Sequence, residues 1–153
     1  MRIVVTSDSH RREGNLFEII ERHLDNADLF INLGDGENDV DSVLMVYPNL
    51  NIKRVAGNND WYSKHPNSQL IEFAGKRIFF AHGHTYYVKH GYERIIQKAK
   101  EIKADICLFG HTHTPFVEMI DGIYFMNPGA VCNNSYGIID IVDDKILAYN
   151  TKV

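Results

Sequence analysis

The sequence predicts an α/β fold in which two mixed β-sheets pack face to face and helices flank them. Strand-like apolar runs alternate with segments of helical periodicity in the first half, which is typical of parallel strands joined by crossovers. Strand-like runs separated by short turns dominate the second half, which favours hairpins. The 153 residues suit one compact core, so we expect residues 1–153 to form a single domain.

Strands and helices alternate along the first half of the chain. Each expected strand is a short apolar run, and each expected helix repeats apolar residues at helical spacing. The expected strands cover residues 2–7, 28–33 and 52–56, and the expected helices cover 16–24 and 40–47, the second closed by Pro48. Because parallel strands need crossovers of this length, we predict a largely parallel sheet here.

Hairpins and one helix are expected in the second half. Ala74-Gly75-Lys76 is a turn short enough to join antiparallel strands, and apolar spacing from Tyr92 to Ile102 predicts an amphipathic helix. The expected strands cover residues 70–73, 77–81, 106–109, 116–120, 123–126, 136–141 and 146–149. Because the pattern changes here to strands joined by short turns, we expect two sheets packed face to face, with helices on their outer faces.

Composition excludes several classes of partner. The formal net charge of −4 and the lack of any lysine or arginine block argue against nucleic acid as an obligate partner. No apolar stretch approaches the length of a membrane span or a signal-peptide core, so we expect no membrane partner and a cytoplasmic location. Cys107 and Cys132 form no Cys-x-x-Cys pair, and we expect two free thiols.

Five polar clusters directly follow expected strands. They are Asp8-Ser9-His10, Gly34-Asp35-Gly36, Gly57-Asn58-Asn59-Asp60, His82-Gly83-His84 and Gly110-His111-Thr112-His113. Most of these arise easily by chance, and a single one has a simple structural explanation as a turn or a hydrogen-bonded loop. Gly-His-x-His is expected at random only about 0.03 times in this composition. The ordered set at strand ends therefore indicates a site.

The residue types in these clusters suit a site for divalent metal ions. Carboxylate, amide and imidazole donors without thiolate fit manganese, iron, nickel, cobalt or zinc. Residues two apart in an extended segment point to the same side, so Asp8 and His10 are expected to face one ion, and Asp35 is the natural bridge to a second. The candidate ligands are Asp8, His10, Asp35, Asn58, His82, His111 and His113.

With these clusters in this order, the sequence resembles the calcineurin-like metallophosphoesterase superfamily. The match runs from Asp8 to His113, and Asn127-Pro128-Gly129 beyond it resembles the small single-domain bacterial and archaeal phosphodiesterase branch. The resemblance implies a four-layer sandwich and two divalent ions, with manganese expected first. It implies that one ion is held by Asp8, His10, Asp35 and His113, and the other by Asp35, Asn58, His82 and His111.

The chain departs from the wider superfamily at Asn59. Many members carry there a histidine thought to protonate the leaving group, which an amide cannot do, and Asp60 is the usual partner of that histidine. The resemblance therefore implies that a metal-bridging hydroxide attacks a small phosphodiester, with preference for acidic aryl leaving groups. Asp35 and Asn59 are the catalytic candidates, and His84 and Arg11 join Asn59 as candidate substrate contacts.

Several alternatives stay open at the level of sequence. The chain could be a phosphomonoesterase or protein phosphatase, or a noncatalytic scaffold such as the phosphoesterase-like subunit of the eukaryotic retromer. That subunit has lost the bridging aspartate, whereas Asp35 is present here. The aromatic residues beside the clusters could stack on a substrate, pack internally or meet a second copy of the chain: Trp61, Tyr62, Tyr86 and Tyr87. A homo-oligomer is likewise left open.

Overall fold

A computed structural model describes residues 1–153 and contains two five-stranded β-sheets. The first sheet has the strand order β10-β9-β1-β2-β3. Its strands are β1 (Arg2–Thr6), β2 (Leu29–Asn32), β3 (Ile52–Arg54), β9 (Ser135–Val142) and β10 (Lys145–Lys152). β1, β2 and β3 are parallel, as the alternation of strands and helices predicted, and β9 joins β1 in antiparallel orientation.

The second sheet has the strand order β4-β5-β6-β8-β7. Its strands are β4 (Ser68–Phe73), β5 (Lys76–Ala81), β6 (Ile106–Leu108), β7 (Phe116–Ile120) and β8 (Ile123–Asn127). Hairpins form its two edges, as expected, but β5, β6 and β8 are parallel to one another at its centre. The helical crossover between β5 and β6 explains this difference from an all-hairpin sheet.

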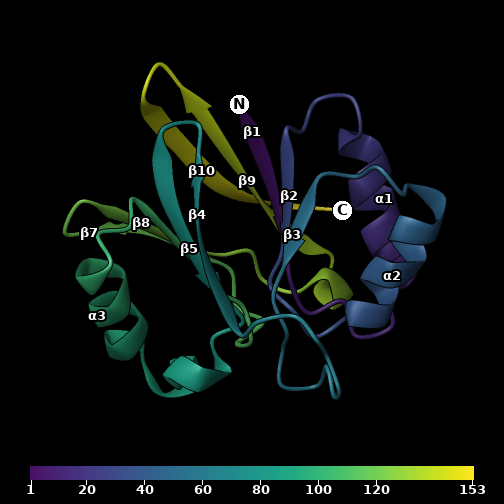
Figure 1. The fold of residues 1–153 in the computed structure, drawn as a ribbon, viewed down its shortest axis with the longest axis horizontal. Coiled ribbons are helices and arrows are strands. Elements are labelled where there is room, and N and C mark those ends of the chain that lie inside the picture. The colour runs from purple at the N-terminus through teal and green to yellow at the C-terminus, as the bar shows by residue number, and fades with distance from the viewer.

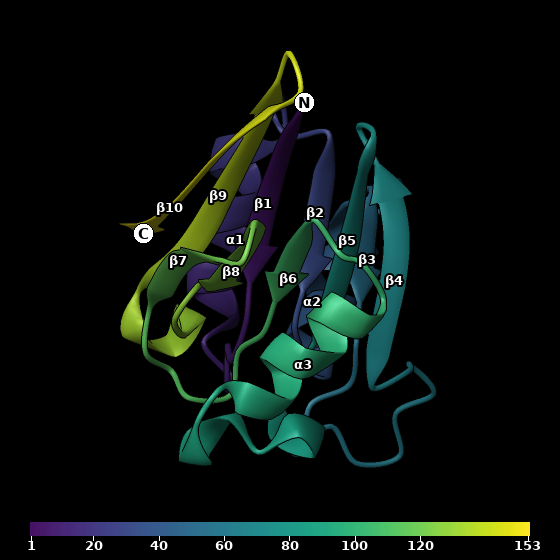
Figure 2. The ribbon, with the colours of Figure 1, turned by 90° about the vertical axis from the view of Figure 1, so that its left-hand side faces the viewer.

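Three helices cover the outer faces of the two sheets (Figure 1). α1 (Glu13–His23) and α2 (Glu37–Val46) lie on the first sheet, and α3 (Glu93–Glu101) lies on the second (Figures 1 and 2). β1 shows how the layers are joined: Ile3 and Val5 belong to the core between the sheets, whereas Val4 packs beneath the helices. This alternation follows from the period of two in a strand. The predicted face-to-face α/β sandwich is confirmed.

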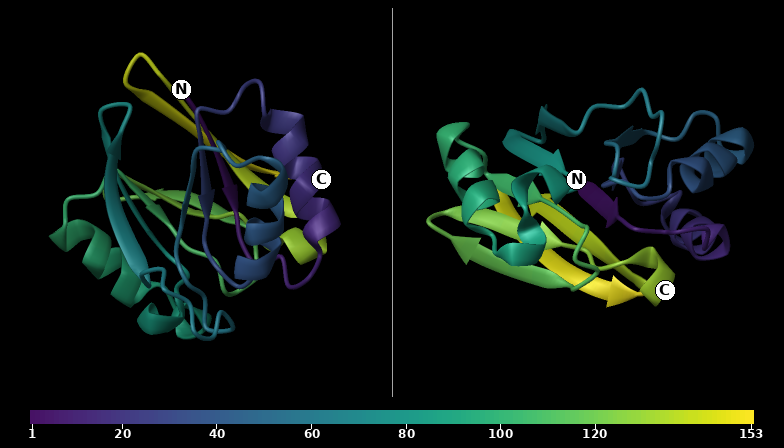
Figure 3. Two further views of the ribbon diagram at one scale, coloured as in Figure 1. Left: turned by 45° about the vertical axis from the view of Figure 1, so that its right-hand side comes forward. Right: turned by 90° about the horizontal axis from the view of Figure 1, so that it is seen from below.

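Parallel strands place their carboxyl ends at one edge, and the loops that follow β1, β2, β5 and β6 leave the sheets at the same end of the molecule (Figure 3). Three short 3-10 helices, which the sequence did not predict, also occur: His84–Tyr86, Val88–His90 and Val131–Asn133. None of the helices combines the length and the apolar character needed to cross a bilayer.

Candidate metal centre

The strand-end loops bring six of the seven candidate ligands together in two groups. Within each group, the ligand atoms all lie within 4.8 Å of one another. The first group contains Asp8, His10 and His113, and the second contains Asp35, His82 and His111. Both groups combine residues of the first sheet with residues of the second, so the centre lies where the carboxyl ends of the two sheets meet.

In the first group, the distances between donor atoms are those expected around one ion. His10 Nε2 lies 3.2 Å from His113 Nε2 and 3.4 Å from Asp8 Oδ1, and His113 Nε2 lies 3.1 Å from that oxygen. Donors about 2.1 Å from a shared ion at tetrahedral or octahedral angles lie roughly 3.0 to 3.4 Å apart. The three residues therefore fit a metal ion without rearrangement.

The second group is similar and is linked to the first through Asp35. His82 Nε2 lies 3.1 Å from His111 Nδ1 and 3.4 Å from Asp35 Oδ2. The same Asp35 oxygen lies 3.7 Å from His10 Nε2, which belongs to the first group. One carboxylate oxygen thus faces both groups, as a bridging ligand must.

The backbone reaches this arrangement by left-handed turns rather than by extended segments. Five candidate ligands have positive φ angles between 44° and 68°: Asp8, His10, Asp35, His111 and His113. The expectation that Asp8 and His10 converge along an extended segment was wrong, because β1 ends at Thr6 and the chain turns sharply after it. Such conformations are strained in residues other than glycine and persist only where surrounding contacts enforce them.

Hydrogen bonds to Asp8 provide part of this enforcement. The hydroxyl of Ser7 and the backbone N–H of His111 donate to Asp8 Oδ2 over 2.5 Å and 3.0 Å. Asp8 is fully buried, and its other oxygen, Oδ1, is the one that faces His10 and His113. Gly110 permits this packing, because a Cβ there would lie 2.0 Å from the Ser7 hydroxyl.

His82 is oriented by a contact that joins the two sheets. Its Nδ1–H donates to the backbone carbonyl of Leu33 over 2.7 Å, and the ring is fully buried. Because Nδ1 is occupied by this contact, Nε2 is the ring nitrogen that faces Asp35 and His111. Backbone partners of this kind fix the tautomer of metal-binding histidines in many proteins.

Asn127 explains why the Asn-Pro-Gly sequence accompanies the metal-binding clusters. Its buried side-chain amide donates to Gly110 O and Thr112 Oγ1, each over 2.9 Å. Its Oδ1 accepts from the backbone N–H of Gly129 over 2.9 Å. The Gly-His-x-His loop is therefore held from beneath by the end of β8.

Asp60 is a supporting residue whose role sequence reasoning missed. Its carboxylate accepts four backbone N–H groups over 2.8 to 3.1 Å, those of Asp35, Gly36, Glu37 and Gly57. It therefore caps the start of α2 and fixes the backbone of Asp35. The proximity of Asp60 to Gly57 was a signal for a turn-capping aspartate, but nothing in the sequence indicated the three contacts with residues 35–37.

The remaining candidates lie around the two groups. Asn59 donates from its backbone N–H and from its amide to the Asp35 carboxylate. The side chain of Asn58 is exposed on the loop that follows β3. The ring centroid of His84 lies 5.4 Å from that of His82, and its Nδ1 is buried without a hydrogen-bond partner. Arg11 lines one cleft together with His10, Asp35 and Asn59.

The four aromatic residues beside the clusters differ in their surroundings. Trp61 and Tyr62 are 78% and 98% exposed and line the cleft that contains Asp35. Tyr86 packs edge-on against Phe79, and Tyr87 lies beneath the guanidinium of Arg94. Packing therefore accounts for Tyr86 and Tyr87, whereas Trp61 and Tyr62 are free to meet a ligand.

The electrostatics of the site favour a bound cation. Burial acts to raise the pKa of Asp35, but hydrogen bonds and charge from His82 and the donors of Asn59 together lower it well below its ordinary value. Burial, aided by the charge of His82, lowers the pKa of His111 to about 4, so this imidazole is a neutral ligand at pH 7. Buried carboxylates beside a neutral imidazole need positive charge nearby. The donor set therefore fits divalent ions.

The cysteines take no part in this site. Cys107 is buried within β6 and Cys132 is half-buried, and both are free thiols, as expected. Burial raises the pKa of the Cys107 thiol, which makes it an unreactive core residue.

Comparison with known proteins agrees with this geometry. Residues 1–144 match the model of the calcineurin-like phosphoesterase superfamily domain. The chain is 30% identical to "Probable metallophosphoesterase YsnB" of Bacillus subtilis strain 168, over 94% of this chain and 86% of that protein. It is 28% identical to "Phosphodiesterase MJ0936" of Methanocaldococcus jannaschii, over 97% of this chain and 96% of that protein.

A solved structure supports the same relationship. The crystal structure of a predicted phosphoesterase from Streptococcus pneumoniae TIGR4 aligns with a TM-score of 0.84 and 28% identity, over 99% of this chain and 88% of that one. With the family match and the two histidine–aspartate groups, it shows that the chain belongs to the calcineurin-like phosphoesterase superfamily, in the small prokaryotic branch of these metal-dependent phosphoesterases.

Proposed function

We propose that the protein hydrolyses phosphodiesters at a centre of two divalent metal ions. One ion is held by Asp8, His10, Asp35 and His113, and the other by Asp35, Asn58, His82 and His111. The observation that carries this proposal is the single oxygen of Asp35, which lies 3.7 Å from His10 Nε2 and 3.4 Å from His82 Nε2. Asn58 completes the second set from the loop after β3, where its exposed amide is free to turn inward.

Manganese is the metal that we propose first, on the basis of the family resemblance, and the oxygen and nitrogen donors are compatible with it. Nickel, iron, cobalt and zinc fit the same donor set. Divalent ions held there would activate a water molecule near neutral pH and offset charge on the phosphoryl oxygens. The role of the protein is to hold the metal-binding side chains in place, chiefly through hydrogen bonds of Ser7, Asp60 and Asn127.

The leaving group is proposed to depart without an acid from the position of Asn59. An amide does not give up a proton near neutral pH, and the amide of Asn59 is directed at Asp35. Arg11 and His84 are the remaining candidates for contact with the substrate, Arg11 from the wall of the cleft and His84 from beside His82. General acids typically contribute about 10² to 10⁴ in rate, so acidic aryl leaving groups are favoured.

A panel of substrates tests this proposal. The protein, stripped of metal and then loaded with manganese, is given bis(p-nitrophenyl) phosphate, p-nitrophenyl phosphate and diethyl phosphate. We expect rapid release of p-nitrophenol from the diester, slower release from the monoester and no measurable hydrolysis of diethyl phosphate. Equal rates on aryl and alkyl diesters contradict the leaving-group argument, and a faster monoester reaction favours a phosphatase.

A noncatalytic scaffold is the second candidate, and it predicts metal binding without turnover of any ester. The presence of Asp35 between the two groups favours an enzyme. Metal content and hydrolysis measured on the same preparation separate the two candidates.

A further inference from the structure

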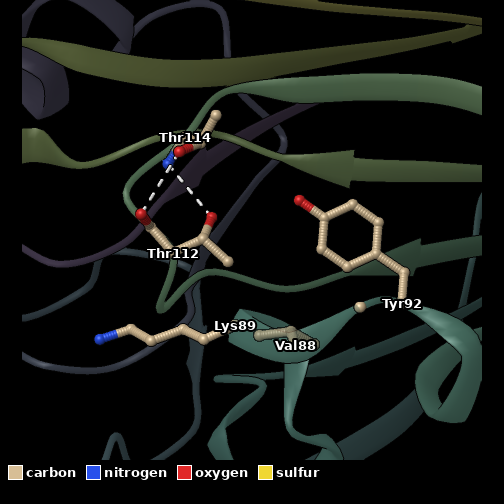
Figure 4. Close-up of a pocket in the computed structure, with 6 residues that line it drawn as sticks. Val88, Lys89, Tyr92, Thr112 and Thr114 are labelled. Carbon is tan, nitrogen blue, oxygen red and sulfur yellow. Dashed lines mark hydrogen bonds between the residues drawn. The ribbon is translucent and has the colours of Figure 1, made fainter.

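A second cavity lies beside the metal-binding loop, outside the cleft that contains Asp35. It has a volume of about 540 Å³ and is lined by Val88, Lys89, Gly91, Tyr92, Thr112 and Thr114 (Figure 4). Thr112 stands between His111 and His113 in the sequence, so the wall of this cavity is also the loop that carries two metal-binding candidates. We call it the Lys89 cavity.

The hydroxyl of Thr112 can only act as a donor toward this cavity. Its Oγ1 accepts the side-chain amide of Asn127 over 2.9 Å and the backbone N–H of Thr114 over 3.1 Å. A hydroxyl has two acceptor positions and one proton. Because both acceptor positions are taken, the remaining capacity of Thr112 is its O–H.

Lys89 adds an unpaired positive charge. It is exposed on the 3-10 helix Val88–His90 and takes part in no ion pair or side-chain hydrogen bond of the chain. Its side chain extends below Thr112, with the ammonium on the side away from Tyr92 (Figure 4).

Tyr92 contributes a third donor. Its ring packs edge-on against Phe109 and Phe116, with centroids 4.8 Å and 5.0 Å away. This packing fixes the ring, and the hydroxyl points into the cavity toward the threonines (Figure 4). No residue of the chain accepts or donates a hydrogen bond there, so the hydroxyl is available to a ligand.

The two hollows beside the metal centre differ sharply in charge. No carboxylate lines the Lys89 cavity, which presents an ammonium and two free hydroxyls. Four carboxylates line the other cleft, those of Asp35, Glu37, Asp39 and Asp60. Arg11 is the only arginine or lysine among the residues that line it. A negatively charged group is therefore attracted to the Lys89 cavity.

We propose that the Lys89 cavity is a subsite for a second anionic group of the substrate, a carboxylate or phosphate carried by the part of the diester that is not the leaving group. Lys89 pairs with this group, and Thr112 and Tyr92 donate hydrogen bonds to it. This inference rests on the proposed phosphodiesterase function and narrows its substrates to diesters that bear a further negative charge.

Two diesters with the same leaving group provide the test. They are p-nitrophenyl phenyl phosphate and p-nitrophenyl 4-carboxyphenyl phosphate, assayed with the manganese-loaded enzyme at 0.15 M salt so that long-range attraction is screened. We expect kcat/KM to be about tenfold higher for the carboxylated ester, as for one exposed charge-assisted hydrogen bond, mainly through a lower KM.

Lys89→Gln is expected to reduce this preference to about one, and Tyr92→Phe to reduce it about threefold, because phenylalanine keeps the packing and removes only the hydroxyl. Lys145→Gln is the matched control. Lys145 is exposed at the start of β10, which lies near the amino end of β1 and therefore at the end of the sheet opposite the metal centre. The Lys145→Gln substitution removes the same positive charge as Lys89→Gln. It should leave the preference unchanged.

The outcomes separate this inference from the function on which it rests. If neither ester is hydrolysed with any metal, the proposed phosphodiesterase function is wrong. If both are hydrolysed at equal rates, or if Lys89→Gln retains the preference for the carboxylated ester, the enzyme stands and the anionic subsite is overturned.

Discussion

Asn59 donates two hydrogen bonds to Asp35, one from its backbone N–H to Oδ1 and one from its side-chain amide to Oδ2, each 2.8 Å long. Oδ2 is also the oxygen that faces both metal-binding groups. Gly57 makes room for this contact, because a Cβ there would lie 2.0 Å from Asp35 Oδ1. Asn59 thus positions the carboxylate that we propose as the bridge between the two ions.

Asn59→Ala is expected to weaken metal binding about tenfold, the lower end of the range for partners of metal ligands. The backbone N–H still reaches Oδ1, but Oδ2 loses the donor that orients it. Calorimetric titration of the stripped protein with manganese measures the change. Asn49→Ala, at an exposed position away from the site, is the control. Equal affinities in the two variants would mean that Asn59 does not orient Asp35.

Asp35→Asn is expected to lose both ions, because the bridge loses its charge and much of its donor strength. The Asp8 carboxylate and the four histidines remain in this variant, so the metal content per chain shows whether they still hold part of the metal. Elemental analysis of metal per chain after dialysis provides the measurement, with Asp41→Asn as a control at an exposed carboxylate that pairs with Arg54. Two ions per chain retained in Asp35→Asn would contradict the bridging role.

The ligand clusters were predictable from sequence because parallel strands must end at a common edge, and each cluster follows a strand. Apolar runs predicted strands over residues 2–7 and 28–33, and apolar periodicity predicted a helix after each. The structure has these elements at Arg2–Thr6, Leu29–Asn32, Glu13–His23 and Glu37–Val46. The supports of the site were not predictable in the same way. Asp60 reaches residues 35–37, and Asn127 reaches Gly110, across loops whose relative position depends on tertiary packing.

Lys89 illustrates the same limit for substrate contacts. No motif includes it, and its sequence neighbours are those of an ordinary surface turn. Its proximity to His111 and Thr112 follows from the 3-10 helices after β5, which periodicity did not indicate. Residues that bind a substrate through one charge leave no repeated pattern in a single sequence.

Asp60→Asn is expected to lower the free energy of unfolding by about 2 kcal/mol. Asparagine offers one oxygen where the carboxylate offers two, and its NH₂ group then faces two of the four backbone N–H donors. Urea denaturation in the presence of a chelator measures this loss of unfolding free energy without a contribution from bound metal. Asp25→Asn, at an exposed aspartate on the loop after α1, should be neutral. A loss as small as that of the control would show that water replaces the cap.

The ion pair between Arg2 and Asp140 predicts a pH dependence of stability that is independent of metal. The two residues are cross-strand partners on β1 and β9, and the guanidinium meets the carboxylate in a bidentate contact of 2.7 Å and 2.9 Å. The Arg2 hydrogen bonds lower the pKa of Asp140 below its ordinary value of 3.8. Because the folded pKa is the lower one, the pair stabilises the fold above about pH 4, and this contribution disappears as the pH falls through the folded pKa.

Asp140→Asn should therefore cost about 1 kcal/mol of unfolding free energy at pH 7, the upper range for a partly exposed pair. The difference from the natural chain should shrink steadily as the pH falls below 4 and vanish once Asp140 is protonated in both the folded and the unfolded state. Urea titrations at a series of pH values measure it. Asp144→Asn removes a carboxylate that is 85% exposed and pairs with Lys76, so it should show a smaller effect. A difference for Asp140→Asn that does not shrink as the pH falls would assign its cost to packing rather than to charge.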